Sequence, residues 1–272
     1  MSERNPEARD RFRGMRLRAI RTQRLGLGLK QAADSVGWHG SKLSRTERGL
    51  RAVTIQDFAM LLTAWDLPAD ERDQILEELA QGSSSGWWDR PISGVPIDVG
   101  TLAAYEAEAN GLVNVAVAAV PGLLHTRETA AAVMAADGVP PEDVDRRWMA
   151  RLQRQQILTR IEYTTYIAES AVRTPWGGPE VWRAQLGHLL RCDELGLAQI
   201  RIIPHTQTSV LLLNTWLWMR FPQTPPVVHV ELGSGVTYIH EADWYTEVLE
   251  RLDRVAVPRD GTRKLIRELM EG

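Results

Sequence analysis

The sequence predicts two domains of different class: an N-terminal all-α domain of five helices, then an α/β (α+β) domain with a largely antiparallel sheet covered by helices. Three observations lead to this prediction. Apolar residues recur at helical spacing before residue 82, a Gly/Ser-rich QGSSSG follows, and short β-branched and aromatic runs then appear between helical segments. We expect domains at residues 1–82 and 98–272, joined by a linker at residues 83–97.

Five helices are expected in the first domain. The first has an apolar helical period and is interrupted by GLGLK. The second covers LKQAADSVG and stops at Gly37, and the third lies in GSKLSRTERG and stops at Gly49. The fourth begins at Thr54, since TIQD resembles a capping box, and the fifth follows Pro68, a favoured first-turn residue.

The second domain mixes helices with strands. Helices are expected in LAAYEAEANGL, TRETAAAVMAA, PEDVDRRWMARLQRQQILTRI and GPEVWRAQLGHLLRCDEL. Strands are expected in VNVAVAAV, EYTTYIAE, AQIRIIP, TWLWMRFP, PVVHVEL and VTYIH. The last four runs are close together in the sequence, which favours an antiparallel meander before two closing helices.

The charge is divided unevenly along the chain. Residues 1–56 contain 13 Lys and Arg against 5 Asp and Glu, whereas the remainder contains 19 against 30. A basic N-terminal module on an acidic body is the distribution that nucleic-acid binding requires. A merely solvated arginine-rich face would give the same count, so charge alone does not decide between the two.

Residues 30–48 have the pattern of a helix-turn-helix. Two short helices, residues 30–36 and 41–48, are joined by the turn GWHG. On a helical wheel of the second helix Leu43 points to one side, with Thr46 and Glu47 beside it. We expect Glu47 to form a structural ion pair with Arg18 or Arg21, and Trp38 in the turn is interpreted as a core residue.

The second helix of such a pair lies in the DNA major groove, where Arg and Lys donate to guanine and Ser to several bases. Basic residues at and beyond the helix end are better placed for phosphates. Base contacts are therefore expected from Ser41, Lys42, Ser44 and Arg45, and phosphate contacts from Arg21, Arg24, Arg48 and Arg51.

The residues from LRAIRTQRLGLGLK to LLTAW resemble the helix-turn-helix of the lambda-repressor-like (XRE) regulators, in the GW..SK.SR.ERG version found in actinomycetes. VPGLLHTRETAAAVMAA, RLQRQQIL, AESAVR, AQLGHLLR, IRIIP and VVHVEL resemble the C-terminal domain of unknown function of the WhiJ-type, antitoxin-like regulators. The resemblance implies a DNA-binding transcriptional regulator, and it suggests a small partner protein encoded nearby.

The sequence departs from this family pattern at two positions. Many XRE proteins have a Gln that contacts phosphate or base as the first residue of the second helix. Leu29 takes that place here, and Gln31 is the candidate substitute. The family's PGLLQT reads PGLLHT, with His125 in the Gln position.

No pattern indicates an enzyme, a metal site or a cofactor. GxSxG, P-loop and GxGxxG patterns do not occur, and the six histidines form no HxxxH or HExxH. The single Cys192 excludes an internal disulfide and a Cys-based zinc site. With neither a signal peptide nor a membrane-spanning run indicated, we expect a cytoplasmic protein with no membrane partner.

The sequence leaves three functions open. The first is a sequence-specific transcriptional regulator that binds double-stranded DNA as a homodimer. The second is an antitoxin-like protein whose acidic body binds a small basic partner and which autoregulates. The third is a sensor with a small-molecule ligand in the second domain. The candidates for ligand or partner contact there are His125, Trp216 and Trp218. Most tryptophans are nevertheless expected in the core.

Overall fold

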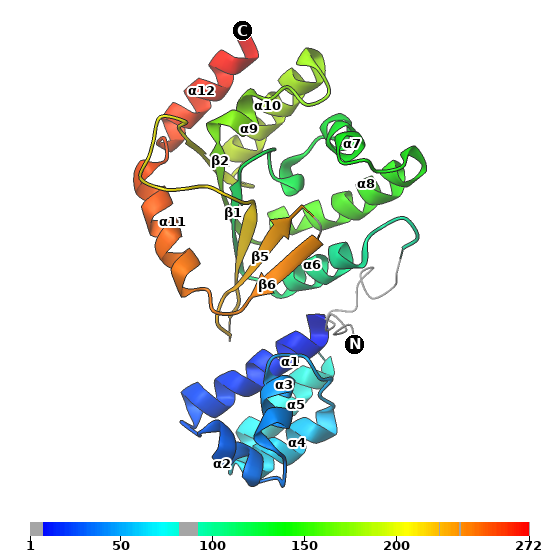
Figure 1. Ribbon diagram of the computed structural model, residues 1–272, viewed down its shortest axis with the longest axis vertical. Coiled ribbons are helices and arrows are strands. Elements are labelled where there is room, and N and C mark those ends of the chain that lie inside the picture. The colour runs from blue at the N-terminus through cyan, green and yellow to red at the C-terminus, as the bar shows by residue number, and fades with distance from the viewer. Residues whose placement is uncertain (1–7, 82–91, 223, 234, 272) are drawn as a thin grey trace. The chain divides into compact units, whose positions relative to one another are not determined.

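The computed structural model describes residues 8–81, 92–222, 224–233 and 235–271 (Figure 1). The chain divides into two compact units, the first holding Met1–Asp89 with Pro222–Pro225 and the second holding Arg90–Phe221 and Pro226–Gly272. Each unit has a hydrophobic core of its own. Most of the linker predicted at residues 83–97 lies outside the described residues.

The described part of the first unit holds five α-helices, as the sequence predicts. They are α1 (Ala8–Ala19), α2 (Leu29–Asp34), α3 (Gly40–Glu47), α4 (Ile55–Ala64) and α5 (Ala69–Gln81), and a π-helical turn, η1 (Ile20–Arg24), extends α1. The capping box expected at Thr54 is formed: the Thr54 hydroxyl accepts from the Asp57 N–H, and the Asp57 carboxylate accepts from the Thr54 N–H.

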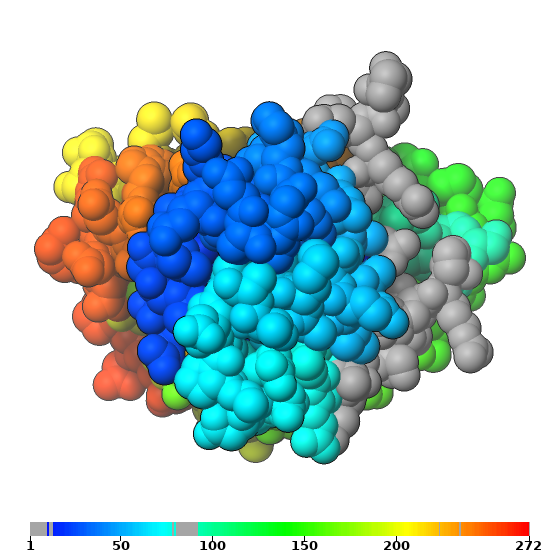
Figure 2. Space-filling view, turned by 90° about the horizontal axis from the view of Figure 1, so that it is seen from below, coloured from blue at the N-terminus to red at the C-terminus, as the bar shows by residue number. Residues whose placement is uncertain are grey.

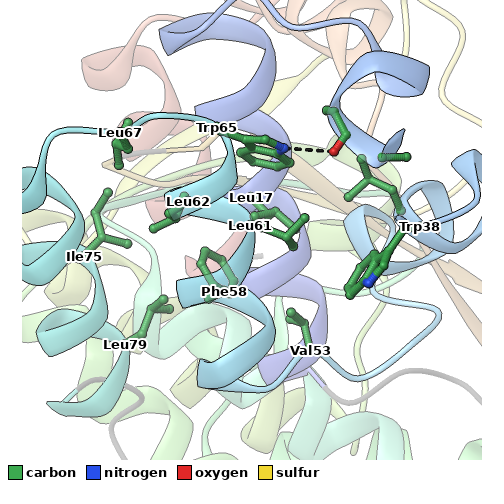
Figure 3. Close-up of a cluster of buried hydrophobic side chains, with 13 residues drawn as sticks. Leu17, Trp38, Val53, Phe58, Leu61, Leu62, Trp65, Leu67, Ile75 and Leu79 are labelled. Carbon is green, nitrogen blue, oxygen red and sulfur yellow. Dashed lines mark hydrogen bonds between the residues drawn. The ribbon is translucent and has the colours of Figure 1, made fainter. Parts of the chain in front are cut away.

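The core of the first unit is built from every helix and from the turns between them (Figure 3). Leu17, Phe58 and Leu61 are fully buried. The indole Nε1–H of Trp65 donates to the Ala32 carbonyl at 3.0 Å, which satisfies the one polar atom of that side chain inside the core. The short helices are therefore held by packing, since helices of this length are unstable alone.

The second unit is a six-stranded mixed sheet with helices on both sides (Figure 1). Its strands are β1 (Gly111–Ala116), β2 (Glu162–Ala168), β3 (Gln199–Ile203), β4 (Trp216–Arg220), β5 (Val227–Leu232) and β6 (Gly235–Ile239). Its helices are α6 (Ile97–Glu108), η3 (Gly122–Leu124), α7 (Arg127–Ala136), α8 (Pro141–Gln155), η4 (Gln156–Thr159), α9 (Glu169–Arg173), α10 (Pro179–Glu194), α11 (Asp243–Val255) and α12 (Arg259–Glu271).

The strand order is β3-β2-β1-β4-β5-β6. All six predicted runs form strands, and β4, β5 and β6 form the expected antiparallel meander. The prediction that β3 belongs to this meander is wrong. β3 pairs parallel with β2 at the opposite edge, because α10 supplies the long crossover that parallel pairing requires, and residues 204–215 then carry the chain back to β4.

The two faces of the sheet differ in chemistry. Val115 on β1, Trp216 on β4 and Val228 on β5 pack with Val248 and Leu252 of α11 on one face. The alternation of side chains along a strand places Asn114 of β1 and its neighbours on the other face. Figure 1 shows α6 and α8 on that second side.

Candidate nucleic-acid interface

The turn before α3 is formed by residues with local structural roles. Gly37 adopts a φ of +66°, which L side chains rarely adopt, and the Trp38 N–H donates to the Ala33 carbonyl at 2.9 Å. His39 then caps α3, since its Nδ1 accepts from the Ser41 N–H at 3.3 Å. The sequence GWHG therefore ends one helix and starts the next, as a helix-turn-helix requires.

The inner side of α3 is fixed against α1 and η1. Leu43 and Thr46 are fully buried, and Glu47 is 4% exposed. Arg21 binds the Glu47 carboxylate with two bonds, Nε to Oε1 at 2.5 Å and Nη2 to Oε2 at 2.9 Å. A bidentate, buried pair of this kind sets the position and rotation of α3. Of the two partners expected for Glu47, Arg18 and Arg21, it is Arg21 that forms the ion pair.

Gly14 permits the close approach of α1 to the end of α3. A Cβ at this position would lie 2.3 Å from the Thr46 carbonyl oxygen and 2.8 Å from that of Glu47. Both atoms belong to backbone that cannot move independently of α3. Sequence reasoning did not identify this residue, although a glycine inside an apolar helical pattern is a signal of close backbone contact.

The outer side of α3 carries the side chains predicted to contact bases. Ser41 and Arg45 are exposed, Lys42 and Ser44 are half-buried, and Arg48 at the C-cap is exposed. Neither Arg45 nor Arg48 forms an ion pair with another residue in the described part of the chain. One helix thus presents hydroxyl and guanidinium donors in a row on its solvent side.

The ring of Trp38 lies against two of the basic side chains, Lys42 and Arg51. It is 7% exposed and belongs to the core, while the Lys42 Nζ lies 3.7 Å and the Arg51 Cζ 5.1 Å from its ring centroid. These are cation–π distances. Arg51 also lies 4.0 Å from the Asp57 carboxylate. The interpretation of Trp38 as a core residue agrees with its burial, and its ring face also positions Lys42 and Arg51.

The residues predicted to contact phosphates fall into two groups. Gln31 and Arg24 are exposed, and Arg24 reaches Glu71 of α5 at 3.2 Å. The phosphate contact expected of Arg21 is corrected, because this residue is 7% exposed. Its donors are occupied by Glu47 and by the Leu27 carbonyl at 2.7 Å. Arg21 therefore holds α3 in place and is not available to DNA.

The charge within this unit is segregated. Residues 13–51 of α1 to α3 and their turns carry the exposed Arg18, Lys30, Arg45 and Arg48, whereas α5 reads ADERDQILEELAQ, with five carboxylates against one arginine. In the space-filling view, α1 to α3 (blue) and α5 (cyan) occupy separate parts of the unit's surface (Figure 2). Among the described residues of this unit, the part with α3 carries the positive charge that DNA phosphates attract.

The ligand candidates of the second unit lie in structural positions. Trp216 is 6% exposed and packs with Tyr245 at 5.0 Å between ring centroids, and the Trp218 Nε1–H donates to the Thr246 hydroxyl at 3.2 Å. Both belong to the α11 face because they are two residues apart on β4. Trp216 is thus a core residue, as most tryptophans are expected to be, and half-buried Trp218 packs against the same cluster.

His125, the other candidate for ligand or partner contact, is 3% exposed at the end of η3. One ring nitrogen, Nε2, lies 2.8 Å from the Val120 carbonyl, and Nδ1 lies 2.9 Å from Nη1 of Arg151. Burial and the charge of Arg151 lower the pKa of His125 to about 3, so the ring is neutral. A neutral ring donates from Nε2 and accepts from Arg151 at Nδ1.

Across the described ranges, no helix is both long and apolar enough to cross a membrane. The same residues contain no group of three or more His, Cys, Asp or Glu side chains arranged to hold a metal ion.

Two protein families match the chain. The family described as "Helix-turn-helix domain" matches residues 13–75, which contain α2, α3 and the turn between them. The family described as "Domain of unknown function (DUF5753)" matches residues 99–268, which contain the whole sheet. No curated protein and no solved structure matched the chain.

Proposed function

The chain belongs to the DUF5753 family and carries a helix-turn-helix domain of DNA-binding regulators, and from these premises we propose that it regulates transcription by binding a specific DNA sequence through α3. The observation that carries the proposal is the division of α3. Its inner side is fixed by Leu43 and the Arg21–Glu47 pair, whereas its outer side leaves Arg45 without an ion-pair partner among the described residues.

In the proposed complex α3 lies in the major groove, with its N-terminal residues at the base edges. Arg45 donates to guanine O6 and N7, and Ser41 and Ser44 bond to bases at the groove floor. Lys42, supported by the Trp38 ring, takes a neighbouring base. Each well-placed bidentate contact discriminates against the wrong base by about 1–3 kcal/mol.

Phosphate contacts are proposed for residues that flank this helix. Arg48 and Arg51 follow α3, Gln31 is exposed on α2, and Arg24 is exposed after α1. Arg24 would exchange Glu71 for a phosphate, a change with little cost because an exposed ion pair contributes only about 0–1 kcal/mol. These contacts set affinity and register for all sequences alike.

We propose further that the protein acts as a homodimer. One small helix-turn-helix buries little DNA surface, and two copies reading half-sites roughly 34–36 Å apart supply the remainder. The second unit is the proposed site of dimerisation or regulation, and the cytoplasm is the proposed location.

The test is DNA binding by the full chain. Operator sequences are first selected from random DNA, and affinities are then measured by fluorescence anisotropy over a range of salt concentrations. Arg45→Ala is expected to lose about 1–3 kcal/mol on the preferred site and to relax the preference at one base pair. Arg48→Ala is expected to weaken all sequences alike and to reduce the salt slope by about one unit.

The matched control is Arg183→Ala, which removes an exposed arginine from α10 of the second unit. It is expected to bind as the unmodified protein does. The proposal fails if Arg45→Ala keeps both the affinity and the base preference of the unmodified chain. An unchanged salt slope in Arg48→Ala would remove that residue alone from the interface.

A second candidate is the antitoxin-like function, in which the second unit binds a small basic protein encoded nearby. The observation that favours it is the acidic balance of residues 90–272, which carry 22 Asp and Glu against 18 Lys and Arg. Co-expression with the product of the adjacent reading frame and co-purification in high salt tests it. A complex that dissociates at about 1 M salt would fit charge steering alone and not a stable partner.

A further inference from the structure

The outer face of α11 carries acidic and basic side chains in a regular order. α11 packs on the sheet through Val248 and Leu252, and Figure 1 shows it on the outside of the second unit, with the sheet on one side only. Its opposite side exposes two acids followed by two bases. These residues, called the charged stripe, are Glu247, Glu250, Arg251 and Arg254. Spacings of three and four residues place them on one helical face.

Three of these four charges have no partner among the described residues. Glu247, Glu250 and Arg254 form no ion pair with any residue in the described ranges. The helical spacing would allow pairs between Glu247 and Arg251 and between Glu250 and Arg254, yet neither pair is formed. Arg251 donates instead to the Ser209 carbonyl. The carboxylates of the charged stripe are therefore available to a partner.

The other charges of α11 serve the second unit itself. The Asp253 carboxylate accepts from the Tyr166 hydroxyl at 3.0 Å and from Arg201 at 2.9 Å. Asp243 lies in the first turn, where the helix dipole favours a carboxylate. These contacts explain the charges beside the stripe, but they do not explain the stripe.

The segment 209–213 lies along one side of α11 and adds apolar surface. Its Ser209 carbonyl is bound by Arg251, and its residues 210 and 212 pack in the cluster that contains Leu252. The alternate residues Leu211 and Leu213 are 78% and 73% exposed. The alternation that buries two side chains of this segment therefore leaves two leucines in solvent beside α11.

Trp244 extends this apolar surface. It precedes Arg251 by seven residues, about two helical turns, so it lies on the same side of α11 as the segment that Arg251 binds. Its side chain is 60% exposed, although it makes an edge-to-face contact with Tyr245, with ring centroids 4.9 Å apart. Exposed apolar side chains gathered beside one helix are typical of a protein–protein interaction surface.

The order of the charges indicates which partner the stripe fits. In an antiparallel pair of α11 helices with a two-fold axis beside residues 250 and 251, Glu247 is opposite the partner's Arg254. Glu250 is then opposite the partner's Arg251, and the symmetry repeats both pairs. A parallel pair would place every charge opposite its own copy, which is unfavourable. The charged stripe is therefore complementary to itself in the antiparallel orientation.

We propose that α11 is the dimerisation helix and that it pairs with α11 of a second copy of this chain. The inference rests on the homodimer proposed above and assigns its interface. The two-fold axis is perpendicular to the helix pair, so the 209–213 segments of both copies lie on the same side of the pair. Leu211, Leu213 and Trp244 supply the apolar area. The ion pairs set the orientation, because exposed pairs add little affinity but discriminate against like charges.

Sedimentation equilibrium of the full chain without DNA measures the dimer dissociation constant. Glu247→Arg places arginine opposite arginine twice in the dimer, and Arg254→Glu places glutamate opposite glutamate twice. Each variant alone is expected to weaken dimerisation at least about tenfold. Trp244→Ser is expected to weaken it as well, through the loss of apolar area. Glu180→Arg reverses an exposed glutamate of α10, and this matched control is expected to dimerise as the unmodified chain does.

Mixing the two reversal variants tests the contact directly. In a heterodimer of Glu247→Arg with Arg254→Glu, the new arginine of one copy is opposite the new glutamate of the other, and the second pair keeps its native charges. The mixture is expected to form heterodimers with an affinity close to that of the unmodified dimer. Native mass spectrometry of copies with different tags detects them. A variant that had lost its fold would not be rescued by mixing.

DNA binding separates a failure of this inference from a failure of the proposed function. Arg45→Ala is expected to leave the dimer dissociation constant unchanged. Glu247→Arg is expected to keep the base preference on a single half-site and to lose affinity for a site with two half-sites. An unexpected result with Arg45→Ala thus concerns α3 alone, and one with Glu247→Arg concerns α11 alone.

Three outcomes overturn the inference. The first is that the unmodified chain stays monomeric up to its highest soluble concentration. The second is that both reversal variants dimerise as the unmodified chain does, because another surface then forms the dimer. The third is that both variants are monomeric and their mixture forms no heterodimer, because the two positions are then not opposite each other.

Discussion

Replacing Arg21 by methionine is expected to release α3 from the rest of its unit. The Arg21 and Glu47 side chains are 8% and 4% exposed and are joined by two short hydrogen bonds. Methionine keeps most of the apolar stem but leaves the Glu47 carboxylate buried and unpaired. Breaking a buried pair in this way costs about 3–5 kcal/mol.

The first unit is small, and for a domain of its size each kcal/mol corresponds to about 4–8 °C in melting temperature. The expected loss is therefore at least about 12 °C for this unit. The local loss of stability can be measured by hydrogen exchange of the full chain, followed peptide by peptide. The amides of α3 and η1 should lose protection, whereas those of the sheet in the second unit should keep it.

Two further variants make the reasoning testable. Arg18→Met removes an exposed arginine from the same helix and is expected to leave the protection of α3 unchanged. The double variant Arg21→Met, Glu47→Leu removes both charges and is expected to recover most of the loss, since an apolar pair of similar volume replaces the buried ion pair. The reasoning is refuted if Arg21→Met leaves α3 protected but reduces the salt slope of DNA binding, because Arg21 would then contact phosphate.

Two other predictions follow from distances and pKa values. Gly14→Ala places a Cβ 2.3 Å from the Thr46 carbonyl oxygen. This variant is therefore expected to destabilise the first unit by about 1–3 kcal/mol, measured by urea unfolding. An unchanged urea midpoint would contradict the close contact. His125 has a folded pKa of about 3, below the ordinary 6.5, so the unfolded chain binds the proton more readily. Stability is therefore expected to fall as the pH decreases from about 6.5 towards 3, and His125→Asn should reduce that slope; equal slopes in both proteins would argue against a neutral buried ring.

The local features of the first unit could be read directly from the sequence. Three of these features each depend on a few adjacent residues, and the structure has them where they were expected. They are the capping box at Thr54, the left-handed backbone of Gly37 and the start of α5 after Pro68. The residues that face the core from α3 follow from helical periodicity in the same way. The assignment of α3 as the second helix of the pair needed no long-range information.

The errors occurred where distant parts of the chain decide. An arginine near a helix end has the same sequence signal whether it faces solvent or a buried carboxylate, so Arg21 was assigned to DNA. The partner of a strand is set by a crossover that the strand's own residues do not encode, so β3 was placed in the wrong part of the sheet. Arg151 gave no signal, because its contacts with His125 and Gly122 depend on how η3 packs against α8.

The separation of acid and base in the first unit has a consequence for the rate of DNA binding. A body with a positive side and a negative side experiences a torque in the field of a polyanion. The unit would rotate as it approaches, so that α3 leads and α5 with its carboxylates trails. A larger fraction of encounters then begins in the productive orientation, and neutralising α5 would remove this orienting torque.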